Sequence, residues 1–195
     1  MKRLSLYLFL ILFTLPTPSQ ADDIRDFQIE GMSIGDSLLD HFSEREIKKA
    51  RQKKQYPGSN KFIISTFLKK KKKPYEIYEM VTINHRNKNK NYEIVSLAGR
   101  LLFNNNDQCI KKKDEIVNEI SEIFEDTFLN NQSKKHRGDK TGKSIITMTI
   151  FTFKSDDGVQ VSCTDWSEDM GLKDGLKVTV ANKEYIDFIL NEAYK

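Results

Sequence analysis

The sequence predicts an α+β fold in which helices pack on an antiparallel sheet, in the order α-βββ-α-βββ-α. Three observations lead to this class. Two groups of segments are rich in Ile, Val, Tyr and Phe and partly alternate with polar residues, as strands do. Outside these groups, apolar residues recur every three or four positions, as on one face of a helix. The turns between strands are short, which is typical of antiparallel neighbours.

The first half of the chain is expected to begin with a helix. Ser33 can cap this helix, with Asp36 three positions later in a capping-box-like arrangement. One face of the helix would carry Ile34, Leu38, Leu39, Phe42 and Ile47, and the helix would end before Pro57-Gly58. Three strands are then expected at residues 61–68, 75–85 and 92–103.

The second half is expected to repeat this order. An apolar stripe predicts a helix over residues 107–127, and a polar loop follows at 130–143. Strands are expected at 144–154 and 159–164, joined by a turn that contains Asp157-Gly158. A last strand at 176–180 precedes a helix capped by Asn182. The halves are topologically similar, but the sequence leaves open whether they form one sheet or two.

Residues 1–21 have the pattern of a secretory signal peptide. A cationic start, Met1-Lys2-Arg3, precedes an apolar stretch, and small residues at Ser19 and Ala21 predict cleavage between Ala21 and Asp22. The remaining chain, residues 22–195, is expected to be a single α+β domain of the periplasm or the secreted fraction. No transmembrane span is expected after cleavage, because no apolar run has the length of one.

The two cysteines, Cys109 and Cys163, are expected to form a disulfide. An even pair of cysteines in an oxidising compartment favours this interpretation. Cys109 lies on the apolar stripe of a predicted helix, and Cys163 lies on the apolar face of a predicted strand. Both side chains therefore point inward. Two separate buried thiols are the alternative.

Three segments approach catalytic motifs without completing them. Gly31-Met32-Ser33-Ile34-Gly35 fits a nucleophile elbow, but no hydrolase sheet precedes it. Residues 138–144 resemble a phosphate-binding loop, but the spacing is one residue short and a strand follows instead of a helix. Asp165, Ser167 and Asp169 alternate as in a calcium loop, but the required Gly and Glu are absent.

No metal or cofactor is expected. The three histidines, His41, His85 and His136, fall on three different elements, so none has a partner at metal-ligand spacing. No pair of carboxyl residues stands out as a general acid and base. No catalytic residue is therefore assigned from the sequence.

The distribution of charge is the strongest functional signal. Residues 44–73 hold twelve Lys or Arg against two Glu. An unbroken basic run, predicted to lie in a hairpin turn, is the candidate site for an anionic partner: Lys69, Lys70, Lys71, Lys72 and Lys73. That partner would be an envelope component or an acidic protein. Nucleic acid is not expected, because the segment lacks interleaved aromatics for base stacking. A solvated lysine-protected edge is the alternative.

Two function classes therefore follow from the residues. The first is a non-enzymatic binding or interaction protein with a basic face. The second is a periplasmic hydrolase or small-ligand-binding protein with a site near Asp165–Asp169, or, for a hydrolase, at Ser33. A purely structural envelope component is a third possibility, and the oligomeric state stays open.

Four segments carry a resemblance: residues 29–40, 139–144, 163–167 and 191–195. Together with Cys109 they resemble a family of small exported proteins of unknown function from Pelagibacter-type marine alphaproteobacteria. Gly31-Met32-Ser33 before an amphipathic stretch also resembles, more distantly, BamE-like and β-lactamase-inhibitor-protein-like modules. That likeness implies a helix-plus-sheet fold and a protein-binding role. The lipoprotein cysteine of the BamE type is absent here.

Overall fold

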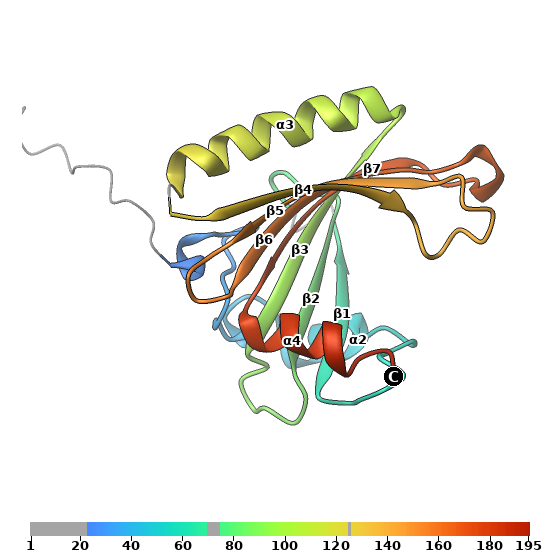
Figure 1. Cartoon of the computed structure of the whole chain (residues 1–195). Helices are drawn as coiled ribbons and strands as arrows, with labels where there is room; N and C mark the ends of the chain where they lie inside the picture. Colours follow the sequence, from blue (N-terminus) through green and yellow to red (C-terminus); the bar gives the residue numbers. More distant parts are fainter. Residues whose placement is uncertain (1–22, 70–74, 125) are drawn as a thin grey trace, which may run out of the picture.

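A computed structural model describes residues 23–69, 75–124 and 126–195 (Figure 1). Its helices and strands are η1 Ile24–Asp26, η2 Leu38–Asp40, α2 Glu44–Ala50, β1 Phe62–Leu68, β2 Met80–Arg86, β3 Ile94–Phe103, α3 Asn106–Ile123, β4 Phe128–Lys135, β5 Ile145–Thr152, β6 Gly158–Asp165, η3 Glu168–Met170, β7 Asp174–Ala181 and α4 Lys183–Asn191. The α+β class is confirmed. The signal peptide and its cleavage site lie outside the described residues.

The strands form one seven-stranded antiparallel sheet in the order β1-β2-β3-β7-β6-β5-β4. Each half of the chain contributes a meander, and the two meanders join where β3 pairs with β7. The two halves therefore share one sheet, which the sequence had left open. The sheet twists strongly: in Figure 1 the strand direction turns progressively across the sheet, so that β1 and β4 at its two edges run in clearly different directions.

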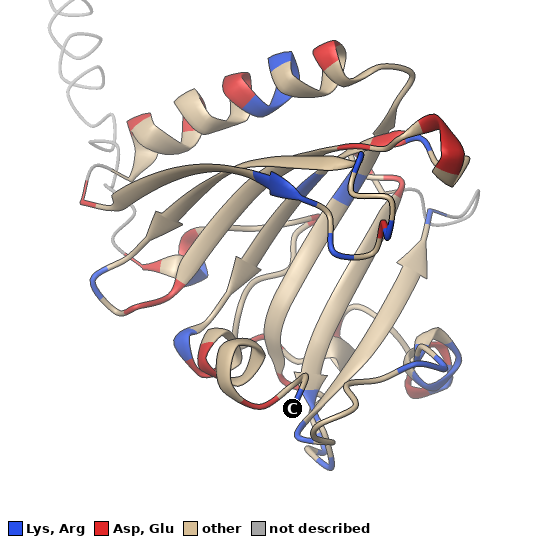
Figure 2. Cartoon of the chain, turned by 45° about the vertical axis from the view of Figure 1, so that its right-hand side comes forward, with Lys and Arg blue, Asp and Glu red and all other residues tan. Residues whose placement is uncertain are grey.

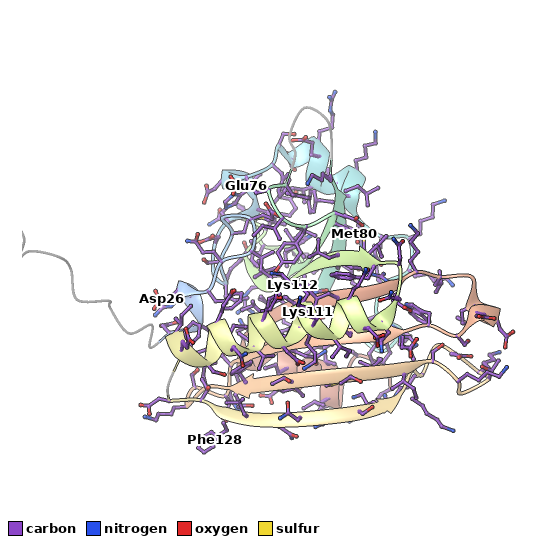
Figure 3. All side chains as sticks on the ribbon, turned by 90° about the horizontal axis from the view of Figure 1, so that it is seen from above. Asp26, Glu76, Met80, Lys111, Lys112 and Phe128 are labelled. Atoms are coloured by element: carbon purple, nitrogen blue, oxygen red, sulfur yellow. A yellow bond between two sulfur atoms is a disulfide. The ribbon has the colours of Figure 1, made fainter. Side chains whose placement is uncertain are left out.

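One face of the sheet is covered by α3 and by the N-terminal segment, and the main core lies beneath them. Figure 3 looks down on α3 where it crosses the strands. Cys109 of α3 and Cys163 of β6 are fully buried and joined by a disulfide, with Cα atoms 5.9 Å apart. The predicted pairing is confirmed.

The opposite face is covered only in part. There α4 packs against β3 and, with the C-terminal turn, forms a smaller core of Tyr56, Phe62, Val95, Phe188 and Ala193. Elsewhere this face is open to solvent: Leu68 of β1 and Leu102 of β3 are 62% and 42% exposed. In Figures 1 and 2, α3 and α4 lie on opposite sides of the sheet. We refer to the side that carries α4 as the α4 face.

The helix predicted to begin at Ser33 is wrong. The N–H of Ser33 does donate to the Asp36 carboxylate (2.7 Å), but no α-helix begins there, and only the short 3-10 helix η2 follows at Leu38–Asp40. Gly35 has a φ of +90°, and the backbone of Gly35 and Asp36 pairs with Ile94 at the start of β3. Pairing with the sheet therefore overrides the helical periodicity. The only α-helix of this segment is α2, which begins at a capping box formed by Ser43 and Glu46.

The polar segment after α3 is not only a loop. Residues 128–135 form β4, an edge strand whose eight residues are all exposed. The second meander therefore has four strands, one more than expected. β4 shows no alternation of apolar and polar side chains because neither of its faces is buried. The described helices include none with the length and hydropathy of a membrane span.

Candidate functional site: a groove between α4 and the β4–β5 edge

The α4 face carries a groove of about 690 Å³ between α4 and the β4–β5 edge of the sheet. We call it the α4–β5 groove. One wall is β5, with Ile146, Met148 and Ile150, and the other is α4, with Ile186, Ile189 and Leu190. Its floor is formed by Gly158, Gln160, Thr179 and Ala181, and its other lining residues are Gln132, Lys134, Lys135, His136, Arg137, Val159, Tyr185 and Tyr194.

The helix wall is apolar because α4 carries apolar side chains on two of its faces. Phe188 points to the sheet, is fully buried, and packs edge-on against Phe62 with ring centroids 4.9 Å apart. Ile186 and Ile189 are half-buried, and Leu190 is 74% exposed. Ile186 also approaches the sheet closely, with its Cδ1 3.3 Å from where a Cβ on Gly158 would lie. A second apolar stripe of α4 therefore faces the groove.

The sheet wall is apolar because β5 is apolar on both faces. Phe151 is fully buried in the core beneath α3. Ile146, Met148 and Ile150 alternate with the residues of that face and point to the opposite side, where they line the groove. Strands that are apolar on both faces are normally covered on both. Here Met148 is buried, but Ile146 and Ile150 on either side of it remain partly exposed toward the groove.

Basic side chains border the groove. Lys134 and Lys135 end β4, and Arg137 follows in the loop to β5; all three are exposed. No Asp or Glu is among the residues that line the groove. Within the part of the chain that the structure describes, these three side chains form no ion pair. We call Lys134, Lys135 and Arg137 the basic rim.

The loop that carries this rim is organised by Asp139, which is 4% exposed. Its carboxylate accepts hydrogen bonds from the N–H and hydroxyl groups of both Thr141 and Ser144, and from the Ser167 hydroxyl, at 2.7–3.2 Å. The hydrogen bonds from Ser144 and Thr141 hold the pKa of Asp139 well below its usual value. In the segment that resembles a phosphate-binding loop, the backbone and hydroxyl groups of Thr141 and Ser144 thus bind the carboxylate of Asp139 in the same loop.

His136 connects the groove to Trp166. The two rings lie 4.2 Å apart by their centroids, and the N–H of Gly138 donates to Nδ1 of His136 at 3.0 Å. Burial lowers the pKa of His136, an effect that Asp139 opposes and Arg100 reinforces. A neutral imidazole therefore lines the groove at neutral pH.

The predicted basic run contributes nothing to this groove among the described residues. Lys69 is exposed beyond the end of β1, and its backbone N–H donates to the carbonyl of Glu79 at 2.9 Å. Lys70, Lys71, Lys72 and Lys73 lie outside the described residues.

The acidic segment Asp165–Asp169 is taken up by contacts within its own region. Asp169 pairs with Lys143 at 2.8 Å, and the hydroxyl of Ser167 donates to Asp139. Burial and the nearby Asp174 and Asp107 raise the pKa of Asp165. Ser33 is 6% exposed, and its hydroxyl has no hydrogen-bond partner among the described residues. The described residues contain no group of three or more His, Cys, Asp or Glu placed to hold a metal ion.

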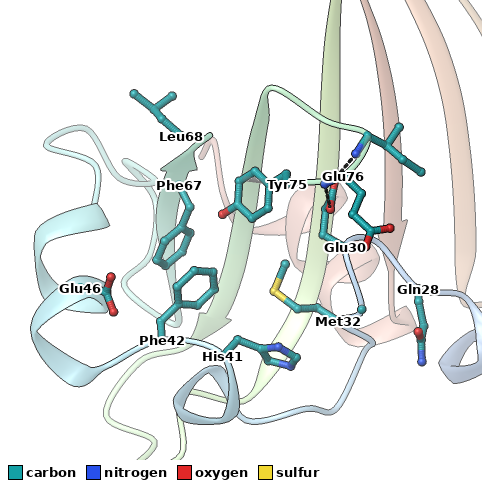
Figure 4. Close-up of a pocket in the computed structure, with 12 residues that line it drawn as sticks. Gln28, Glu30, Met32, His41, Phe42, Glu46, Phe67, Leu68, Tyr75 and Glu76 are labelled. Atoms are coloured by element: carbon teal, nitrogen blue, oxygen red, sulfur yellow. Dashed lines mark hydrogen bonds between the residues drawn. The ribbon is translucent and has the colours of Figure 1, made fainter. Parts of the chain in front are cut away.

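A second pocket, of about 650 Å³, lies beside the N-terminal segment (Figure 4). Its most prominent acid, Glu30, is already engaged: its carboxylate accepts the backbone N–H groups of Glu76, Ile77 and Tyr78 at 2.7–2.9 Å. Phe42 and Phe67 stack at 4.0 Å on the opposite side. Glu30 thus fixes the chain before β2 rather than facing the pocket as an open charge.

Comparisons with protein-family models, curated proteins and solved structures found no match. The function is therefore argued from the α4–β5 groove. Sequence reasoning missed this site, although two signals for it were present. The predicted strand at 144–154 is apolar at both parities, and the final helix has more apolar residues than one buried stripe needs.

Proposed function

We propose that the protein is a non-enzymatic binding protein of an extracytoplasmic compartment, and that its ligand is an amphipathic anion. The apolar chain of the ligand would lie between α4 and β5, and its anionic head would lie near the basic rim. The carrying observation is a groove with apolar walls, a basic rim and no acid in its lining.

The dimensions support a ligand of this kind. A volume of about 690 Å³ falls within the range typical of small-molecule sites. Each methylene group that is fully buried contributes about 0.8 kcal/mol. Affinity should therefore rise with chain length, by up to about fourfold per methylene.

The compartment is supported by two features. The N-terminal sequence has the pattern of a cleaved signal peptide, and the buried Cys109–Cys163 disulfide is of the kind that persists in oxidising environments. The candidates for an enzymatic site, Ser33 and Asp165–Asp169, do not line the groove. A binding role uses the groove without them.

Trp166 provides the test, because it is the only tryptophan in the chain and its ring packs against His136 of the groove lining. Dodecanoate and dodecyltrimethylammonium, below their micelle concentrations, would be titrated against its fluorescence and by calorimetry. We expect the anion to bind and the cation to bind at least tenfold more weakly. Equal binding of the two, or no binding of either, would overturn the proposal.

Matched variants locate the site. Leu190→Glu places a charge on the groove wall. Its control is Ile123→Glu, which places the same charge at the end of α3, away from the groove, where Ile123 is 51% exposed. Lys134→Gln with Lys135→Gln neutralises part of the rim, and Lys111→Gln is its control on α3, which packs on the opposite face (Figure 3). Only the groove and rim variants should weaken dodecanoate binding.

A further inference from the structure

Two cations that form no ion pair among the described residues lie side by side on the α4 face. Arg100 of β3 and Lys177 of β7 are direct cross-strand partners, so their side chains project from the same face of the sheet. Thr179, in the floor of the groove, is two residues from Lys177 along β7. Two residues of a strand span about 7 Å. The pair therefore adjoins the floor of the groove.

Neither side chain has a partner in the described part of the chain. Ser162, the cross-strand neighbour of Lys177 on β6, donates to the Lys177 carbonyl and not to its amine. Arg86 of β2 shows the contrast, because Glu93 and Glu184 both pair with its guanidinium. Like charges placed directly opposite each other destabilise a sheet. Arg100 and Lys177 are thus two neighbouring cations without an acidic partner among the described residues.

The guanidinium of Arg100 extends toward Gly175 of β7. The Nε and Nη2 atoms of Arg100 lie 3.1 and 3.4 Å from the position that a Cβ on Gly175 would occupy. Any larger residue at Gly175 would crowd the guanidinium where it lies beside Lys177. Lys177 is exposed, so its charge lies beside that of Arg100 at the surface, and Arg100 also lowers the pKa of His136 in the groove lining. Arg100 is thus electrostatically coupled both to its strand neighbour and to the groove.

We propose that Arg100 and Lys177 act together with the basic rim in binding the head group of the groove ligand, and that this head is a phosphate monoester. The inference rests on the proposed function, whose ligand it specifies. A guanidinium offers paired N–H donors to two oxygens of one phosphate, and an ammonium adds a compact charge beside it. Two positive charges match a doubly charged head better than a single carboxylate. The same chemistry describes an alkyl phosphate and a free phosphate ester, which the experiment separates.

The test measures the binding of dodecyl phosphate, dodecyl maltoside and methyl phosphate by calorimetry. It uses the full chain and its R100Q, K177Q and K111Q variants, each checked for an unchanged melting temperature. Loss of one charged hydrogen-bonding partner in R100Q or K177Q should lower the affinity for dodecyl phosphate about 10- to 100-fold. Dodecyl maltoside, which has no charge, should bind all four proteins equally. K111Q should behave as the unmodified protein does.

The outcomes distinguish the two proposals. Dodecyl phosphate that binds R100Q and K177Q as tightly as the unmodified protein overturns the head-group assignment and leaves the groove function standing. Methyl phosphate binding that requires Arg100, without binding of any alkyl compound, supports the phosphate site and removes the amphiphile function. No binding of any of the three compounds overturns both.

Discussion

The imidazole of His136 packs against the indole of Trp166, with ring centroids 4.2 Å apart. This contact joins the groove lining to the acidic segment that follows β6. Because Trp166 is the only tryptophan in the chain, its fluorescence reports the state of His136. The contact therefore makes the groove observable without a label.

A first prediction concerns the protonation of His136. Burial lowers its pKa below the ordinary value of 6.5. A protonated imidazole beside an indole quenches its fluorescence, so quenching of Trp166 should set in with a midpoint below pH 6.5. The measurement is a fluorescence titration of the folded protein between pH 4 and 8. His136→Gln should remove this transition, whereas a midpoint above 6.5 would contradict the burial of the imidazole.

A second prediction concerns Asp139. Its pKa is held below the ordinary 3.8 in the folded state. A carboxyl whose folded pKa is depressed adds stability above its unfolded pKa, and this stability is lost as the pH falls through the folded pKa. Asp139→Asn should therefore melt at a lower temperature than the unmodified protein at pH 7. The difference in melting temperature between the two proteins should narrow below about pH 4, because protonation of Asp139 then removes the same stabilising contribution from the unmodified protein.

Thermal melts of both proteins from pH 2 to pH 7 test this. Asp126→Asn is a suitable control, because Asp126 is an exposed partner of the exposed Lys154. If the melting temperature of Asp139→Asn differs from that of the unmodified protein by the same amount from pH 2 to pH 7, the charge of the Asp139 carboxylate is not what closes the loop.

The parts of the fold that the sequence predicted are those with a local signal. Cys109 and Cys163 each lie on an apolar periodicity, so their inward direction and their pairing followed from two local patterns. The Asp157-Gly158 signal located the β5–β6 hairpin, although its left-handed residue is Asp156, with φ of +65°. Such signals need only neighbouring residues.

The candidate site lacked signals of this kind. Arg100 and Lys177 are far apart in the sequence and become neighbours only through the register between β3 and β7. That register joins the two halves of the chain, which no local pattern specifies. β4 is exposed throughout and polar from Asn130 onward, so the sequence from that residue predicts a loop. The groove is formed by residues from several strands and from α4, which only the tertiary structure brings together, so the sequence did not predict it.

A third prediction concerns the disulfide between Cys109 and Cys163. It closes a loop with a sequence separation of 54 residues between α3 and β6. In the chain-entropy model, opening such a loop lowers the free energy of unfolding by about 4 kcal/mol. Urea denaturation of the oxidised and the reduced protein measures the difference. The double variant Cys109→Ala with Cys163→Ala should resemble the reduced protein, and a loss below about 1 kcal/mol would show that α3 is held without the crosslink.

A fourth prediction concerns the contact of Gly99 with Tyr78. A Cβ on Gly99 would lie 2.5 Å from the Tyr78 ring, which is 8% exposed and belongs to the main core. Gly99→Ala should therefore cost about 1–3 kcal/mol through overpacking. In Tyr78→Leu the ring is absent, so adding Gly99→Ala to that variant should cost much less. The coupling free energy from the four urea denaturation curves of this double-mutant cycle is the decisive quantity. Additive costs would mean that the strain of Gly99→Ala comes from the β3 backbone and not from the aromatic ring above it.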